Sequence, residues 1–397
     1  MMMRGFVTFL SALFIAPLAM GAGYTTADTS VISMGMAGTG VARADDPAAA
    51  FLNPAAILFK KGTQVSIGAV MAMPSLSADD GNGAVETEGG FSVPPNLHVG
   101  YSDETFAFGG SFTVPFGSGL AWPSDWSYRF DIVSAEMKVL RASTFVGARY
   151  GMVSIAGGPH LDISTLGLER QIDFISDEGS VVIDTSAFAV GGHVGIYLQP
   201  LDSLSLGLTY RSASSFEFSG SANFQTPDEF QSRATSGPVS TSLTMPHRLA
   251  VGLEWEPVER VALAFEVERN QWSSVDVLLI DFEDPGTEDV EKVRNWKDTT
   301  ALRFAGSYAF DNGTDVRTGI FWDPSPVTDE SVSVDSPDSS RLGLSVGLGL
   351  PLSDAFAVDV AYQFLGFQGA ESSGEDPSIA FTGNAHLLGF AFRYTEG

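Results

Sequence analysis

Residue types that commonly perform catalysis are present in this chain but are not grouped. The sequence contains no cysteine and no HxxxH spacing, and its single GxSxG match, Gly343 to Gly347, lies within an alternating segment and not at a strand-to-helix turn. Metal ions and hydrolytic nucleophiles need such spacings, because several side chains must converge on one atom. We therefore expect no enzymatic activity, no cofactor and no metal. The five histidines lie on separate predicted strands: His98, His160, His193, His247 and His386.

The charge of the chain restricts its partners. The formal net charge is −27 over 397 residues, and no basic tract occurs, so nucleic-acid binding has no support. Hydrophobic residues nevertheless make up 44% of the chain, and the mean hydropathy is positive. A chain that is both acidic and hydrophobic must separate the two properties in space. Alternating strands joined by charged loops do this, and a membrane-spanning barrel is the extreme case.

The first 21 residues have the pattern of an export signal. Arg4 precedes an apolar run over residues 6–20, and small residues follow that run. A run of about 15 residues is short for a spanning helix, which needs roughly 20. We therefore expect residues 1–21 to be a signal peptide, with cleavage between Gly21 and Ala22. An exported chain without thiols also avoids mispairing in the oxidising periplasm.

From residue 63 onward, apolar and polar side chains alternate with a period of two. Between Phe106 and Phe116, for example, aromatic residues and Val114 share one face, while small residues share the other. Successive side chains of a strand point to opposite faces, so this pattern predicts half-apolar strands.

Short and long connections alternate between these predicted strands. Six short turns and seven long loops, one of them expected at 167–182, require fourteen strands. Short periplasmic turns and long external loops are typical of outer-membrane barrels. A β-sandwich or a propeller, the soluble alternatives, would not explain this alternation. The sequence therefore predicts an all-β protein: a transmembrane antiparallel barrel of about 14 strands over residues 63–397, in the outer membrane of a Gram-negative cell.

The last predicted strand, His386 to Tyr394, has an aromatic outer face. It resembles the terminal signal that the barrel-assembly machinery reads, although three residues follow Tyr394 where the aromatic residue is usually the last. We expect this machinery, outer-membrane lipid and lipopolysaccharide to be partners, and the barrel to be a monomer.

Residues 22–62 show no alternation and are rich in small side chains. A fourteen-stranded barrel has a lumen too wide for its own side chains to fill, so we expect this segment to form a plug (hatch) inside it. Its distinctive motif is Asn53-Pro54-Ala55. Proline fixes a local bend, and asparagine can hydrogen-bond nearby backbone. An ordinary turn is the alternative.

Two further features stand out in the chain after residue 100. Gly109 and Gly110 interrupt an otherwise aromatic strand, which predicts a bulge or bend. The loop that follows is unusually aromatic, and this composition fits an apolar capture groove or, equally, an aromatic belt at the membrane interface. The residues concerned are Phe116, Leu120, Trp122 and Trp126.

Short motifs also run through nearly the whole predicted mature chain in a fixed order. They are Ala22-Gly23-Tyr24, Asn53-Pro54-Ala55, Pro95-Asn96, Gly109-Gly110-Ser111-Phe112-Thr113, Gln271-Trp272-Ser273, Trp296-Lys297-Asp298, Ser325-Pro326-Val327, and Pro337-Asp338 with Arg341. In this order they resemble the FadL/TodX-type outer-membrane family, which transports long-chain fatty acids and hydrocarbons. Thr244-Met245-Pro246 departs from the Leu-Pro that is usual in that family.

The resemblance implies passive uptake of a hydrophobic small molecule, captured at external loops and passed to a deeper pocket. Release would be sideways, through a gap at a kinked third strand, which here contains Gly109 and Gly110. Family pockets use a basic residue near Lys292 and Arg294, which makes these two candidates for binding a fatty-acid carboxylate. A solvated salt bridge in a loop is the alternative.

Other functions stay open at this point. A general porin would need an unobstructed lumen, and an outer-membrane lipase or protease would need a compact catalytic constellation. An adhesin or phage receptor without a transport role is a third possibility. If the long loops carry most of the net charge of −27, they repel a fatty-acid carboxylate, which weakly favours neutral hydrocarbons as cargo or, alternatively, a saline habitat.

Overall fold

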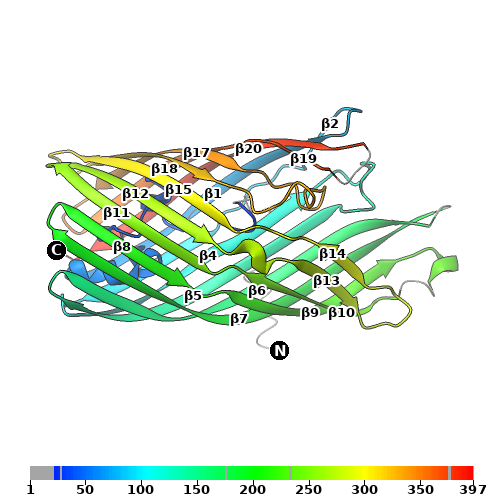
Figure 1. The fold of residues 1–397 in the computed structure, drawn as a ribbon, viewed down its shortest axis with the longest axis horizontal. Coiled ribbons are helices and arrows are strands. Elements are labelled where there is room, and N and C mark those ends of the chain that lie inside the picture. Colours follow the sequence, from blue (N-terminus) through cyan, green and yellow to red (C-terminus); the bar gives the residue numbers. More distant parts are fainter. Residues whose placement is uncertain (1–21, 27–28, 175–176, 232–234, 374–376, 397) are drawn as a thin grey trace.

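The computed structural model describes residues 22–26, 29–174, 177–231, 235–373 and 377–396. They form a closed antiparallel β-barrel around a short N-terminal segment (Figure 1). The predicted signal peptide, residues 1–21, lies outside the described residues. Among the described residues, no helix is long and apolar enough to cross a membrane.

The wall has fourteen strand positions, as predicted from the alternation of connections. Six positions each combine two consecutive elements: β2 with β3, β8 with β9, β10 with β11, β12 with β13, β14 with β15, and β18 with β19. The strands are β1 (Gly62–Asp79), β2 (Ala84–Glu86), β3 (Pro95–Ser102), β4 (Phe106–Ala121), β5 (Ser134–Tyr150), β6 (Val153–Asp173), β7 (Glu178–Leu201), β8 (Leu204–Arg211), β9 (Ser214–Gln225), β10 (Gly237–Met245), β11 (Arg248–Val258), β12 (Val261–Asn270), β13 (Val277–Phe282), β14 (Val290–Val293), β15 (Thr299–Ala309), β16 (Asp315–Asp323), β17 (Arg341–Pro351), β18 (Phe356–Phe367), β19 (Ala370–Glu371) and β20 (Ala380–Thr395).

The first and last strands close the barrel. β1 pairs with β20 from Gln64↔Thr395 to Asp79↔Ala380, and β20 pairs with β18 on its other side. The long loop predicted at residues 167–182 is wrong in its bounds: the connection is shorter, because β6 and β7 remain paired as far as Asp173↔Glu178. Alternation is weak in this stretch, where the strands extend beyond the rest of the wall.

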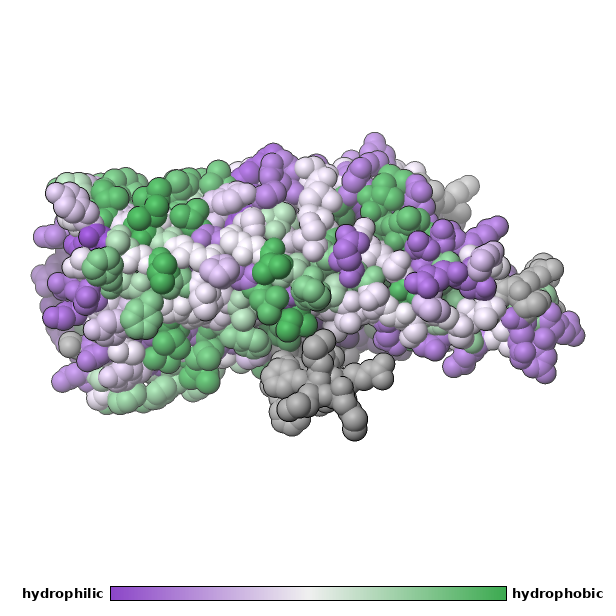
Figure 2. All heavy atoms as spheres, turned by 90° about the horizontal axis from the view of Figure 1, so that it is seen from below, coloured by the Kyte–Doolittle hydropathy of each residue, from purple (hydrophilic) through white to green (hydrophobic). Residues whose placement is uncertain are grey.

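The outer face of the wall carries an apolar belt. Alternate residues point outward, so Phe106 is 63% exposed and Phe188 is 72% exposed. Figure 2 shows hydrophobic side chains concentrated toward the end of the barrel that has the short turns, and hydrophilic side chains at the end with the long loops. Large apolar side chains on the outside are what a barrel in hydrocarbon requires.

The inner face divides into two zones. Around the N-terminal segment it is polar, with buried ion pairs such as Arg141 with Asp162 and Arg317 with Asp359. Toward the long loops it is apolar, and a buried cluster there includes Phe216, Phe381 and several tryptophans. The two zones determine where water-soluble and hydrophobic groups can be accommodated inside the barrel.

The N-terminal segment (the described residues of 22–61) lies between opposite walls. It contains α2 (Val31–Gly35), α3 (Ala49–Leu52) and the 3-10 helix η1 (Pro54–Phe59). Ser30 caps α2, since its Oγ accepts a hydrogen bond from the backbone N of Ser33 at 3.3 Å. α2 packs on β17 and β18, whereas η1 packs on β5, β6 and β7. Two further short 3-10 helices lie in connections, η2 (Asp228–Phe230) and η3 (Trp272–Ser274).

Candidate ligand-binding site

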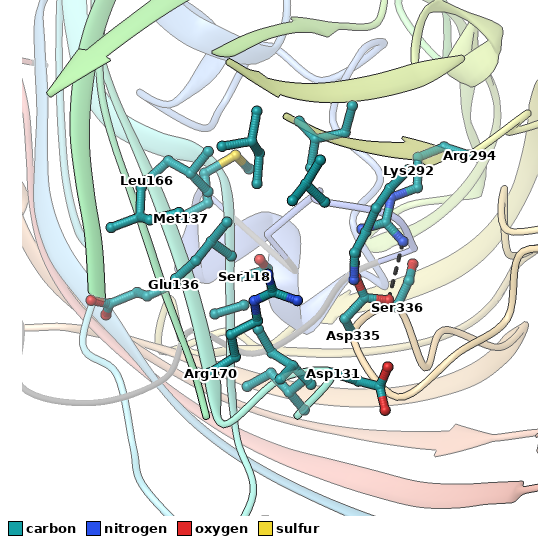
Figure 3. Close-up of a pocket in the computed structure, with 18 of the residues that line it drawn as sticks. Ser118, Asp131, Glu136, Met137, Leu166, Arg170, Lys292, Arg294, Asp335 and Ser336 are labelled. Carbon is teal, nitrogen blue, oxygen red and sulfur yellow. Dashed lines mark hydrogen bonds and ion pairs between the residues drawn. The ribbon is translucent and has the colours of Figure 1, made fainter. Parts of the chain in front are cut away.

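An apolar pocket lies inside the barrel near the long loops (Figure 3). It encloses about 100 Å³ of free space between β4, β5, β6, β7, β13 and β14. The strands place these apolar residues at the pocket because their inward positions are aliphatic at this height. Its lining includes Leu120, Met137, Leu166, Ile183, Ile280 and Trp296.

The start of the N-terminal segment forms one side of this pocket. The backbone N of Gly23 donates to Asp338 Oδ2 at 3.0 Å, and Ser325 Oγ donates to the same oxygen at 2.7 Å. Gly23 has a φ of +60°, and a Cβ at this position would lie 2.9 Å from the Trp272 ring. Tyr24 packs against Trp296 with 4.9 Å between ring centroids. Burial raises the pKa of Tyr24, so its hydroxyl stays neutral at the pocket.

The predicted cations Lys292 and Arg294 do line the pocket, but both are paired with Asp335 (Figure 3). Lys292 Nζ lies 2.5 Å from Asp335 Oδ2, and Arg294 donates to both carboxylate oxygens, at 3.3 and 3.0 Å. The Asp335 side chain is 9% exposed. Its burial would raise the pKa of the carboxyl, but Arg294 and Lys292 hold it well below the ordinary value.

Of the four predicted capture residues, the structure places one at the pocket. Leu120 lines it, whereas Phe116, Trp122 and Trp126 are buried in the surrounding cluster. Trp122 is 1% exposed and donates from Nε1 to the Val334 carbonyl at 2.9 Å. The belt alternative is therefore wrong for these aromatic residues, because their side chains point into the protein and not toward lipid.

The third strand position, β4, bends inward at residues that the sequence reasoning missed. Between the pairs Thr113↔Arg141 and Phe116↔Val139, two residues of β4 face one residue of β5. The extra residue makes a bulge at Val114 and Pro115. The N-terminal segment meets this bend from inside: the backbone N of Thr26 donates to the Pro115 carbonyl at 3.2 Å.

A break in the hydrogen-bonded pairing of the wall accompanies this bend. β3 and β4 are paired up to Leu97↔Phe112, and the next backbone hydrogen bond between the two chain segments runs from Glu88 N to Ala121 O at 2.8 Å. Residues 89–96 and 113–120, all of which the structure describes, share no hydrogen bond in between. Two prolines in this stretch of the first segment, Pro94 and Pro95, lack an N–H donor altogether. We call this stretch the wall opening.

The predicted bend at Gly109 and Gly110 is wrong in position. Both residues are paired regularly with β3 and β5. A Cβ on Gly109 would lie 2.2 Å from the Val99 carbonyl oxygen, so glycine serves a close approach of two strands there. The signal that could have located the bend is Pro115, since proline within a strand marks a bulge or an edge.

Asn53 of the Asn53-Pro54-Ala55 motif forms hydrogen bonds both within the N-terminal segment and to the barrel wall. Asn53 is fully buried, and its Nδ2 donates to the carbonyls of Val41 at 2.7 Å and of Ile196, on β7, at 3.1 Å. Its Oδ1 accepts from the backbone N of Ala55 at 3.2 Å, which caps η1, and Pro54 occupies the first turn of that helix.

Comparisons with known proteins extend over almost the whole chain. Residues 12–395 match the family described as outer membrane protein transport protein (OMPP1/FadL/TodX). Long-chain fatty acid transport proteins of Salmonella typhi and Escherichia coli strain K12 are 23% and 24% identical to it, with 97% of each chain covered.

Solved structures of similar proteins share the fold. A FadL homologue of Pseudomonas aeruginosa superposes with a TM-score of 0.86 at 17% identity, over 94% of this chain and 99% of that one. The toluene transporter TodX of Pseudomonas putida superposes with a TM-score of 0.73 at 16% identity, over 92% and 97%.

Proposed function

Since this chain belongs to the OMPP1/FadL/TodX family of outer-membrane transporters for fatty acids or hydrocarbons, we propose that it moves its cargo passively and sideways. The apolar pocket captures the molecule, and the wall opening beside β4 releases it into the membrane. The observation that carries this proposal is the wall opening, because a fully paired wall would have no lateral exit. The chain is a transporter and not an enzyme.

Both ends of the pocket along the barrel axis are covered, which favours a lateral exit of the cargo over an axial one. Below it, the N-terminal segment packs against opposite walls, and we propose that residues 22–62 act as the plug. Above it, the loop between β16 and β17 turns inward, since Val334 is buried and accepts the bond from Trp122. A general porin needs an unobstructed lumen, so these contacts argue against that alternative.

The physics of transfer supports passive release. Each CH₂ group gains about 0.8 kcal/mol when it moves from water into hydrocarbon, so no nucleotide is needed. The pocket is modest in size: an engineered apolar cavity of roughly 150 Å³ binds benzene, and about 100 Å³ accommodates only part of a longer molecule. We therefore expect one apolar portion of the cargo to occupy the pocket at a time.

Partners follow from the location of the barrel in the outer membrane. A hydrophobic small molecule is the cargo. Lipid, lipopolysaccharide and the barrel-assembly machinery are expected at the outer face and during insertion, and the barrel is expected to be a monomer.

The proposal is tested by removing the bulge. Deletion of Pro115 restores one-to-one pairing of β4 with β5, which straightens the strand and closes the wall opening. Uptake of a radiolabelled alkane by cells should then fall to the level of cells without the protein. Deletion of Pro257 is the matched control, because it removes a proline from a similar bulge between β11 and β12, remote from the opening.

Both deletion variants must first show the heat-modifiable mobility of a folded barrel. A folded variant without Pro115 that takes up alkane at the wild-type rate would overturn lateral release.

A further inference from the structure

The pocket contains its own carboxylate, and this carboxylate bears on which cargo it accepts. We propose that Asp335 occupies the cation pair Lys292 and Arg294 and thereby makes the pocket selective for uncharged hydrophobic molecules over fatty-acid anions. The inference rests on the proposed function, because it assigns a substrate class to the same pocket.

The contacts of Asp335 leave no acceptor position free. Ser333 Oγ donates to Oδ1 at 2.6 Å, in addition to the contacts from Lys292 and the two from Arg294. A carboxylate offers about four lone-pair positions, and four donors reach this one. The backbone also holds Asp335 in place, since a turn from Ser333 to Ser336 is closed by a 3.0 Å hydrogen bond.

A ligand carboxylate would therefore compete with a built-in one. If it displaced Asp335, a side chain that is 9% exposed would lose its three contacts with the cations, and a buried carboxylate without a cationic partner is strongly unfavourable. If it bound alongside, two negative charges would share one cation pair. A neutral molecule meets neither obstacle, because it needs only the aliphatic lining.

Other charged side chains also line the pocket. Among its lining residues, all described in the structure, five carboxylates accompany three cationic side chains. Glu136 is paired with Lys138 at 2.6 Å. The third cation, Arg170 on β6, points into the middle of the pocket, between Glu136 on one side and Lys292 with Asp335 on the other (Figure 3). Glu136 and Asp338 are balanced by Lys138 and Arg341, which lie outside the lining, so the exclusion of an anion depends on the contacts of Asp335 with the cation pair.

The test uses a matched pair of ligands and the full-length protein in lipid nanodiscs. Decanoate carries the negative charge, and methyl decanoate is its uncharged counterpart; binding of each is corrected for partition into empty nanodiscs. The wild-type protein should bind the ester about tenfold more tightly than the anion. Asp335→Asn frees the cation pair, so the affinity for decanoate should rise about tenfold while that for the ester stays within about twofold.

Asp131→Asn is the control for charge alone. Asp131 lines the same pocket but makes no contact with the cation pair, so its loss should leave the ratio of the two affinities within about twofold of wild type. Adding Lys292→Met to Asp335→Asn should remove most of the gain in decanoate affinity, because the ligand then loses one of its two cations.

The outcomes separate the inference from the function on which it rests. If folded Asp335→Asn keeps the wild-type ratio while the ester still binds, the selectivity assigned to Asp335 is overturned and the transport function stands. If neither ligand binds to the wild-type protein, the proposed function itself fails. Should Asp335→Asn not fold, Lys292→Met alone decides: unchanged decanoate affinity supports the inference, and a loss of about tenfold refutes it.

Discussion

Replacing Asn53 with alanine should release the N-terminal segment while leaving the barrel folded. Asn53 makes three hydrogen bonds, and only one of them reaches the wall, at the carbonyl of Ile196. Its side chain is fully buried, so no water can replace the lost amide without a rearrangement. The strands of the wall do not depend on this residue, because Ile196 is paired with β6 and with β8 without it.

The magnitude follows from the number of bonds. A buried hydrogen bond contributes about 1 kcal/mol. If the two bonds within the segment are lost together with the one to the wall when the segment undocks, Asn53→Ala should weaken docking by about 3 kcal/mol. At 1.4 kcal/mol for each factor of ten, the undocked population should rise roughly 100-fold. Asn53→Ser keeps the helix cap at Ala55 but loses both Nδ2 bonds, so its effect should be smaller, about 2 kcal/mol or roughly 30-fold.

Planar-bilayer recording measures this population directly, because an undocked segment opens the lumen to ions. Open probability should increase in the order wild type, Asn53→Ser, Asn53→Ala. Gly195→Ala disrupts the same contact by a change in the wall, because the new Cβ would lie 2.1 Å from Asn53 Oδ1 and push the segment away. It should therefore also raise the open probability.

The reasoning fails if the variants show the conductance of the wild-type protein. Heat-modifiable mobility on gels must confirm a folded barrel in each case. Conductance that is unchanged in Asn53→Ala and in Gly195→Ala would mean that the contact at β7 does not hold the segment. A rise in Asn53→Ala equal to that in Asn53→Ser would assign the effect to the Nδ2 bonds alone and not to the cap.

Two further predictions concern the wall and the pocket. Gly109→Ala should lower the free energy of unfolding of the barrel, measured in urea, by about 1–3 kcal/mol, because the new Cβ collides with the Val99 carbonyl. Gly89→Ala is the control: no atom lies within 4 Å of its Cβ, so the free energy of unfolding should change by less than about 0.5 kcal/mol. The pKa of Asp335 is lowered in the folded protein, so its ion pairs stabilise the pocket above the unfolded carboxyl pKa of about 3.9 and lose this effect as the pH falls through the folded pKa. The protection factor of the Ser336 amide, its exchange rate relative to the intrinsic rate at the same pH, should therefore stay high from pH 8 down to about pH 4 and fall only in stronger acid. Asp335→Asn should abolish this acid dependence, and a fall in protection between pH 7 and 5 in the wild-type protein would contradict the assignment.

The strands of the wall can be predicted from the sequence because they depend on patterns among neighbouring residues. Alternation along Phe106 to Phe116 determines which side chains face lipid, and alternating connection lengths determine the number of strands. The bend of β4 was predicted at the wrong residues because two nearby sequence signals compete. Gly109 and Pro115 both signal irregular strands, and only the register with β5 shows that the proline makes the bulge.

The pocket is harder to predict because it depends on loops that meet across the barrel. The family resemblance identifies Lys292 and Arg294 as candidates. Asp335, in contrast, lies in a loop without periodicity, and its neighbours in the sequence do not indicate that it forms ion pairs with these two residues. Trp122 and Trp126 were expected at a surface. They are buried because the loop between β16 and β17 folds over them, a contact across 212 positions of the chain in the case of Trp122 and Val334.

The seam between β1 and β20 has a consequence for the order of events during biogenesis. Along the rest of the wall, each strand pairs with one that precedes or follows it closely in the chain, whereas this seam joins the two ends. The N-terminal segment is continuous with β1 and contacts strands from β3 to β20. The wall must therefore be assembled around the segment, and the last strand encloses it. A barrel that closed first would have excluded its own N-terminus, so correct timing of the final strand is a requirement for a sealed membrane.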